Sequence, residues 1–250
     1  MKKIIATAAL TALCLSLLTG SALAMDKKEL IQKALEAQGG EKLLKGTKSI
    51  EAHGKALAQG MEFPFAMYQQ RPNLMRLEVE IMGMRMIQAY DGQKGWTVNP
   101  MAGITEPKLM GEDENKGMKL QADMDGALID PEKKGYTLEY IGEADVEGTP
   151  CYQLRVDTGM DLVQDIFYDK EYFLAVKVTS TMQMGETEIV EETYLSDYQE
   201  MEDGRVMPFS MEMRIAGVTS RQIIMESLEF DNDLSAIEFT MPEPVGAAAE

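Results

Sequence analysis

Residues 71–100 read RPNLMRLEVEIMGMRMIQAYDGQKGWTVNP, and this stretch indicates the fold. Apolar and polar side chains alternate on both sides of Gly83, with the period of two that is typical of a β-strand with one buried face. An Arg-Pro-Asn turn opens the stretch, and an Asp-Gly turn divides its second half. Because the connections are short, neighbouring strands should pair antiparallel as a meander. The strands expected here cover 74–82, 84–90 and 95–99.

The same rhythm extends in both directions along the chain. A flat sheet of about a dozen antiparallel strands would tend to curl or split. The expected fold is therefore mainly β, an antiparallel sheet curled into an unclosed β-barrel. It should form one domain over 25–242, and the Pro- and Ala-rich residues 243–250 should form a disordered tail. The further strands expected are 49–59, 61–70, 136–141, 151–158, 163–168, 173–182, 187–198, 206–216 and 219–230.

An amphipathic helix is expected over residues 26–45, ahead of the first strand. It begins with an Asp-x-x-Glu capping box at Asp26 and is interrupted by a Gly-Gly pair at 39–40. Such a helix must lie on an apolar surface. Its apolar face consists of Leu30, Ile31, Ala34 and Leu35.

A second segment breaks the strand rhythm between residues 100 and 135. Prolines and glycines predict a loop over 100–111, and apolar residues at a spacing of four predict a short helix over 112–128. An insertion of this length in a β domain is more often functional than idle. We therefore expect a helical lid. Its apolar residues are Met118, Leu120, Met124 and Leu128.

The first 24 residues have the features of an export signal. Lys2 and Lys3 precede an apolar run over 4–18, and Ala-Leu-Ala at 22–24 is a small-x-small cleavage site. The run is shorter than the roughly 20 residues that span a bilayer. Cleavage after Ala24 and a periplasmic location are expected; an uncleaved anchor is the alternative. Cys14 lies inside the apolar run, which argues against lipidation.

The composition excludes several classes of partner. With 42 acidic and 24 basic residues, the formal net charge is −18, so the surface should repel nucleic acid and anionic lipid headgroups. A basic protein partner and a merely solvated surface both remain compatible with this charge. After the leader, Cys151 is the one remaining cysteine and should be a buried, inert thiol without a disulfide.

Catalytic and metal-binding signatures are missing from the sequence. The acidic pairs lack the spacing of a calcium loop or a glycosidase pair, and neither a Gly-x-Ser-x-Gly motif nor a phosphate-binding loop occurs. His53, the single histidine, has no second histidine nearby to share a metal. We expect no enzyme activity, no cofactor and no metal.

The 21 methionines are the most unusual feature of the composition. Methionine is unbranched and adapts to irregular ligands, so an apolar pocket is one interpretation. An ordinary core that uses methionine is equally compatible, and Cu(I) binding by thioethers is a third possibility. Trp96 could line a cavity or be an ordinary half-buried core residue. The expected cavity lining is Leu77, Val79, Ile81, Met84, Met86, Trp96, Met207, Phe209, Met211 and Met213.

The order of elements resembles the LolA family of periplasmic lipoprotein carriers and lipoprotein-sorting proteins. The resemblance rests on the leader, the amphipathic helix, the turn at 71–73 followed by Leu74, the Asp-Gly at 91–92, Trp96, the Asn-Pro at 99–100 and the helical insertion. It implies an unclosed β-barrel whose cavity holds acyl chains under a helical lid. Arg71 matches the family arginine that latches this lid.

The function implied is a periplasmic carrier that takes the acyl chains of lipoproteins, or similar hydrophobic cargo, toward the outer membrane. Its partners would be lipoproteins or lipid-like ligands, an inner-membrane release complex and an outer-membrane acceptor, and it should be a monomer. The alternative is a lipid- or lipoprotein-sensing regulatory module of the cell envelope, because related folds serve both roles.

Overall fold

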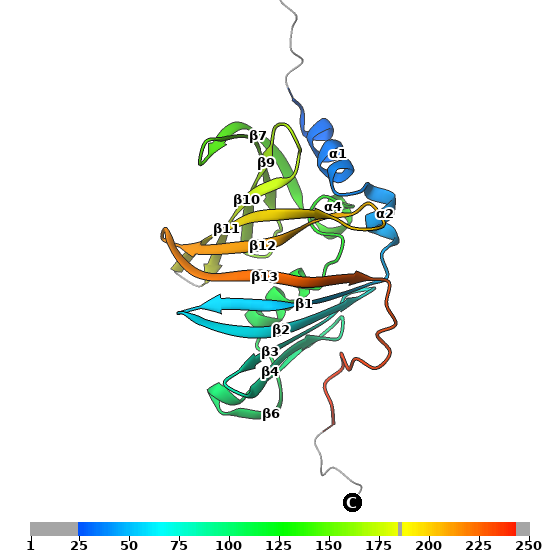
Figure 1. Ribbon diagram of the computed structural model, residues 1–250, viewed down its shortest axis with the longest axis vertical. Coiled ribbons are helices and arrows are strands. Elements are labelled where there is room, and N and C mark those ends of the chain that lie inside the picture. The colour runs from blue at the N-terminus through cyan, green and yellow to red at the C-terminus, as the bar shows by residue number, and fades with distance from the viewer. Residues whose placement is uncertain (1–24, 185–186, 244–250) are drawn as a thin grey trace, which may run out of the picture.

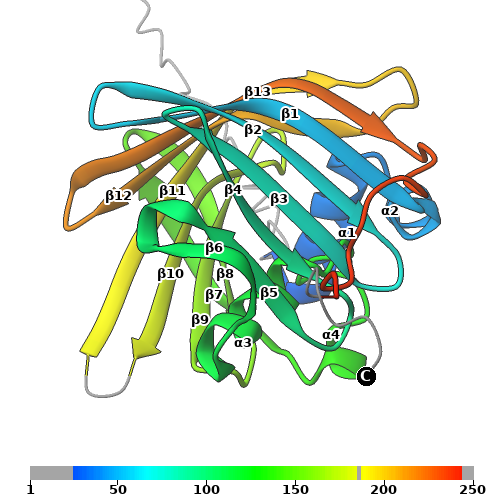
Figure 2. The same ribbon diagram turned by 90° about the horizontal axis from the view of Figure 1, so that it is seen from below.

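The computed structural model describes residues 25–184 and 187–243. The expected leader over 1–24 and residues 244–250 of the expected tail lie outside this part of the chain. Thirteen antiparallel strands form one continuous sheet (Figures 1 and 2). The strands are β1 (Ser49–Ala58), β2 (Met61–Gln70), β3 (Leu74–Ile81), β4 (Met84–Tyr90), β5 (Gly95–Asn99), β6 (Ile104–Leu109), β7 (Thr137–Val146), β8 (Thr149–Asp157), β9 (Leu162–Asp169), β10 (Ala175–Met184), β11 (Thr187–Glu200), β12 (Val206–Ile215) and β13 (Val218–Phe230).

Two meanders make up this sheet. The spatial order runs β6-β5-β4-β3-β2-β1-β13-β12-β11-β10-β9-β8-β7, so β1 pairs with β13 and joins the first meander to the second. Within the described residues β6 and β7 are the two edges and do not pair with each other. The expected unclosed antiparallel β-barrel is thus confirmed, because the sheet curls without closing.

Helices α1 (Lys27–Ala37) and α3 (Glu112–Gln121) lie on the inner side of the curved sheet (Figure 2). The Asp26 side chain caps α1 by accepting from the Glu29 N–H at 2.8 Å, as expected for a capping residue. Gly39 ends this helix with a φ of +109°, and its hydrogen lies against the Gly204 carbonyl, where a Cβ would come within 2.9 Å. The helical elements are α1 (Lys27–Ala37), α2 (Glu41–Gly46), η1 (Pro100–Ala102), α3 (Glu112–Gln121) and α4 (Pro131–Lys134).

Two expectations about the insertion are wrong. Residues 104–109 form the edge strand β6 rather than part of a loop, because an edge strand tolerates Pro107. The helix expected over 112–128 ends at Gln121. Asp123 then accepts a hydrogen bond from the Asp125 N–H, and Gly126 has a φ of +60°, which is turn chemistry.

Candidate functional site

The expected lining residues of β3 and β4 share one face of the sheet. Val79 lies opposite Met86, and Ile81 lies opposite Met84. Leu77 packs beneath α3, so this is the face that α3 covers. Leu77, Val79, Ile81 and Met86 are half-buried, and Met84 is exposed. An apolar face that is only partly covered is able to accept a hydrophobic ligand.

The expected lining residues of β12 belong to the same inner face. Phe209 is buried against residues of β1 and β13, and Met207 packs against this cluster. Met67 of β2 contacts both this cluster and the cluster beneath α3, which links the two parts of the inner face. Met211 and Met213 follow on alternate positions of β12 and are half-buried.

Trp96 does not line this face, and its assignment to the cavity is wrong. Tyr90, which faces α3, pairs with Gly95, so the next residue, Trp96, points to the opposite side of the sheet. There its side chain is 1% exposed and its Nε1 donates to the Phe239 carbonyl at 2.8 Å. The Arg76 guanidinium lies 5.4 Å from the ring centroid. Trp96 thus anchors the segment after β13 to the outer face.

The helix α1 covers the inner face of the second meander. Leu30 and Ala34 are fully buried against side chains of β7, β8 and β9, among them Leu154 and Tyr168. Burial raises the pKa of the Tyr168 phenol far above its usual range, so the phenol stays neutral. The expected apolar surface beneath the N-terminal helix is therefore the inner face of β7–β9.

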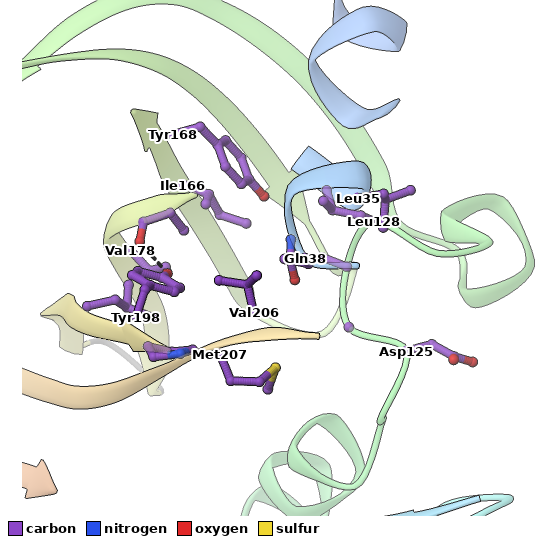
Figure 3. Close-up of a pocket in the computed structure, with 15 residues that line it drawn as sticks. Leu35, Gln38, Asp125, Leu128, Ile166, Tyr168, Val178, Tyr198, Val206 and Met207 are labelled. Carbon is purple, nitrogen blue, oxygen red and sulfur yellow. Dashed lines mark hydrogen bonds between the residues drawn. The ribbon is translucent and has the colours of Figure 1, made fainter. Parts of the chain in front are cut away.

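A cavity of about 260 Å³ lies between the end of α1 and β9–β12 (Figure 3). Its apolar lining includes Leu35, Leu128, Val178 and Met207. The Tyr198 hydroxyl at its wall donates to the Ala175 carbonyl at 2.6 Å. The volume is below the roughly 300–1,000 Å³ of a typical ligand pocket. A long acyl chain would therefore fit only if one of the segments that cover the cavity were displaced.

The helix α3 covers the inner face of the first meander. Its Met118 and the following Ala122 are buried against Met75 and Tyr90. Gln69 of β2 donates its side-chain amide to the Gln121 carbonyl at 2.6 Å, which fixes the end of the helix. The expected lid therefore lies over the strands that carry Leu77.

The other expected lid residues occupy different places. Leu120 is half-buried and lines a second cavity of about 250 Å³ between α3 and the ends of β9 and β10. Met124 and Leu128 lie in the irregular segment 122–130 rather than on the helix, because the helix ends early. Leu128 packs against the cluster beneath α1 and lines the cavity there. The residues of the expected lid thus form a helix plus a loop that reaches the second meander.

Arg71 joins this loop to the rest of the protein. Its guanidinium donates to both carboxylate oxygens of Asp125, at 3.0 and 2.5 Å, and to the carbonyls of Thr47 at 2.6 Å and Leu44 at 3.3 Å. The peptide bond between Arg71 and Pro72 is cis. A bidentate arginine–carboxylate pair is a strong, directional contact. Arg71 therefore connects segment 122–130 to the end of α2, in a geometry suited to a latch.

The ion pair between Arg71 and Asp125 shifts the pKa of both side chains. The hydrogen bonds from Arg71 hold the pKa of the Asp125 carboxyl below its usual range, against the opposing effect of burial. Since the folded-state pKa is depressed, the pair stabilises the fold above the usual aspartate pKa of about 3.9 and is lost as the pH falls below it. At neutral pH the Asp125 carboxylate is therefore charged and paired with Arg71.

We expect Asp125→Asn to loosen segment 122–130 at pH 7. Losing a charge-assisted bidentate contact costs about 1.5–3 kcal/mol, so amide hydrogen exchange in this segment should become about tenfold faster or more. The matched control is Asp165→Asn, which removes another bidentate pair, with Arg155 on the neighbouring strand. Equal exchange of segment 122–130 in wild type and Asp125→Asn would contradict the latch.

Sequence reasoning missed much of the inner face of the second meander. Leu154, Val156, Ile166 and Tyr168 lie beneath α1, and their alternation was visible in the sequence. Asp125 was also missed as the partner of Arg71. Its acidic side chain resembles many others in this acidic chain, so the sequence held no signal for this pairing.

The chemistry of the other polar groups is limited. Among the described residues, His, Cys, Asp and Glu side chains form no group of three or more that could hold a metal ion. Cys151 is buried and free, as expected, and burial raises the pKa of its thiol. Within the described residues no helix combines the length and the apolar character needed to cross a bilayer.

We compared the chain and its fold with known proteins. No protein-family model matches the chain, and no curated protein matches it significantly. A LolA superfamily protein from Nitrosomonas europaea has a TM-score of 0.59 at 10% identity, covering 87% of this chain and 98% of its own. A domain from Vibrio parahaemolyticus, provisionally named an outer membrane lipoprotein-sorting protein, has a TM-score of 0.54 at 13% identity. The match covers 82% of this chain and 94% of that domain.

A third structure extends the comparison. A DUF1329 family protein from Desulfovibrio piger has a TM-score of 0.59 at 14% identity, covering 85% of this chain and 96% of its own. At such low identities the likeness concerns the fold. The fold and the site together define a LolA-like unclosed β-barrel with an apolar inner face beneath helical covers. The resemblance found in the sequence is confirmed at the level of the fold.

Proposed function

We propose that this protein is a periplasmic, monomeric carrier that binds the acyl chains of lipoproteins, or similar hydrophobic cargo, and moves them toward the outer membrane. The observation that carries the proposal is the apolar inner face that runs from β3 to β12, covered in part by α3 and only half-buried along Val79, Ile81, Met211 and Met213. Names of the similar structures that refer to LolA and to lipoprotein sorting support it. No catalysis is required.

Apolar burial supplies the affinity in this proposal. Each buried methylene contributes about 0.8 kcal/mol, so a long acyl chain binds without specific polar contacts. The 260 Å³ cavity beneath α1 must enlarge to accept such a chain. Displacing the loop that carries Leu128 would join this cavity to the face beneath α3, and the Arg71–Asp125 pair would set the cost of that opening.

The proposal is tested by titrating the chain that begins at Met25 with fluorescent acyl probes of increasing length. Binding should saturate, and affinity should rise by up to about fourfold per added methylene until the site is filled. A probe with a polyether tail of equal length is the control and should not bind. If no acyl probe binds under any condition, the carrier proposal fails.

A separate prediction concerns export. The charge pattern, the apolar run and the Ala-Leu-Ala site predict that the mature protein begins at Met25 and occurs in the periplasmic fraction. N-terminal sequencing of the protein from host cell envelopes checks this. Material that remains in the membrane fraction with residues 1–24 attached would contradict the periplasmic carrier.

A further inference from the structure

One end of the barrel exposes an unusual number of apolar side chains. The turns β1–β2, β3–β4, β5–β6 and β12–β13, and the ends of β10 and β11, project away from α1 and α2 (Figures 1 and 2). Of the 12 exposed large hydrophobic residues in the described part of the chain, 9 lie there. We call this set the hairpin rim. It consists of Met61, Met82, Met84, Met101, Met182, Ile189, Val190, Ile215 and Val218.

Local structure does not account for these residues. Met82 and Gly83 both have positive φ, +52° and +77°, so they form a type I′ turn in which asparagine, aspartate or glycine is favoured. Met82 bears the strain of this conformation while its side chain is 79% exposed. Neither turn propensity nor burial favours methionine at this apex. Val218, which follows a second turn of this kind at Ala216-Gly217, is 70% exposed.

We propose that the hairpin rim docks on the surface of a lipid bilayer with zwitterionic headgroups, an inference that rests on the proposed carrier function. The apolar side chains stand at the tips of separate hairpins, which suits insertion between headgroups better than packing against a flat partner. The net charge of −18 disfavours an anionic surface.

The rim also continues into the inner face of the barrel. Ile81 and Met84 are the pair next to the Met82-Gly83 turn and belong to the apolar face whose other end is covered by α3. A bilayer at the rim would therefore meet the apolar face that is proposed to hold acyl chains. Docking here would bring the source or the destination of the cargo to the open end of the site.

Flotation with phosphatidylcholine vesicles tests the proposal. The wild type should float with the vesicles, and Met82→Asn combined with Val218→Thr should weaken partitioning by about tenfold or more, since removing one inserted apolar side chain is worth about that factor. Met82→Asn matches the turn preference, so the variant should fold. The control is Tyr172→Asn, which removes a residue that is 65% exposed outside the rim. Equal flotation of wild type and rim variant overturns the proposal.

A spectroscopic measurement gives an independent answer. Cys151 is buried, so an environment-sensitive dye attached to Met82→Cys reports from the rim alone. Its emission should shift to the blue on addition of phosphatidylcholine vesicles, while the dye on Tyr172→Cys should not respond. No shift at position 82, or an equal shift at both positions, overturns rim docking. Acyl-probe binding by the rim variant should equal that of wild type, so failure of docking and failure of the carrier function are distinguishable.

Discussion

Replacing Met211 by glutamate should abolish binding of an acyl probe, with an affinity loss on the order of 100-fold. Met211 lies opposite Leu195 on one side and Ile223 on the other, in the middle of the inner face. A carboxylate there would face an acyl chain with no water to solvate it, and an unpaired charge in an apolar site costs on the order of 3 kcal/mol. Equilibrium titration with the fluorescent probe measures the loss.

Two matched variants separate the effect of the charge and the effect of its position from a general loss of folding. Met211→Gln has nearly the same size without the charge and should bind more weakly than wild type but far better than the glutamate variant. Ser210→Glu places the same charge on the neighbouring residue, which points to the other face of β12, and should bind as wild type does. A folded Met211→Glu variant that binds the probe normally would show that this face is not the site.

Replacing Trp96 by alanine should destabilise the protein by about 3–5 kcal/mol, the range for deleting a large buried aromatic side chain. Trp96 is 1% exposed beneath the segment after β13, and its Nε1–H bonds to the Phe239 carbonyl. Denaturant unfolding of both proteins measures the difference. Tyr172→Ala, which removes an exposed aromatic side chain, should change stability by about 0.5 kcal/mol or less.

The milder variant Trp96→Phe decides between an anchoring role and a role in the cavity. It should remain folded and should bind the acyl probe with wild-type affinity, because the ring lies on the other side of the sheet from Tyr90 and Met75. A large loss of probe affinity in folded Trp96→Phe would place the tryptophan in the site and contradict the outer-face assignment.

The strands were predictable because their signals are local. The alternation on both sides of Gly83 and the turn residues define the hairpin of β3 and β4 to within a residue. The edge strand β6 was missed because it contains Pro107, which local reasoning assigns to a loop; only pairing with β5 on one side makes it a strand. The presence of the β3–β4 hairpin thus followed from periodicity in the sequence, whereas the presence of the edge strand β6 did not.

The site was predictable in part, for a different reason. Alternation groups Leu77, Val79 and Ile81 correctly, but it cannot say which of two apolar faces looks inward. The apolar residues of β5, Trp96 and Val98, share one face, but alternation does not show whether that face looks inward or outward, and the tryptophan was assigned to the wrong side of the sheet. The pairing of Arg71 with Asp125 joins residues 54 positions apart, and the hydrogen bond of Gln69 to the end of α3 joins residues 52 positions apart, which a local pattern does not contain.

The most direct test of the account is photolabelling of the mature protein with a long-chain acyl probe that carries a diazirine, followed by mass spectrometry of the labelled peptides. If the inner face holds acyl chains, labelling should be saturable in peptides that contain Leu77 and Val79 and in peptides that contain Met211 and Met213, and unlabelled acyl chains should compete with it. Labelling confined to the outer face around Trp96, or no saturable labelling, would contradict the claim that this barrel holds acyl chains on its inner face.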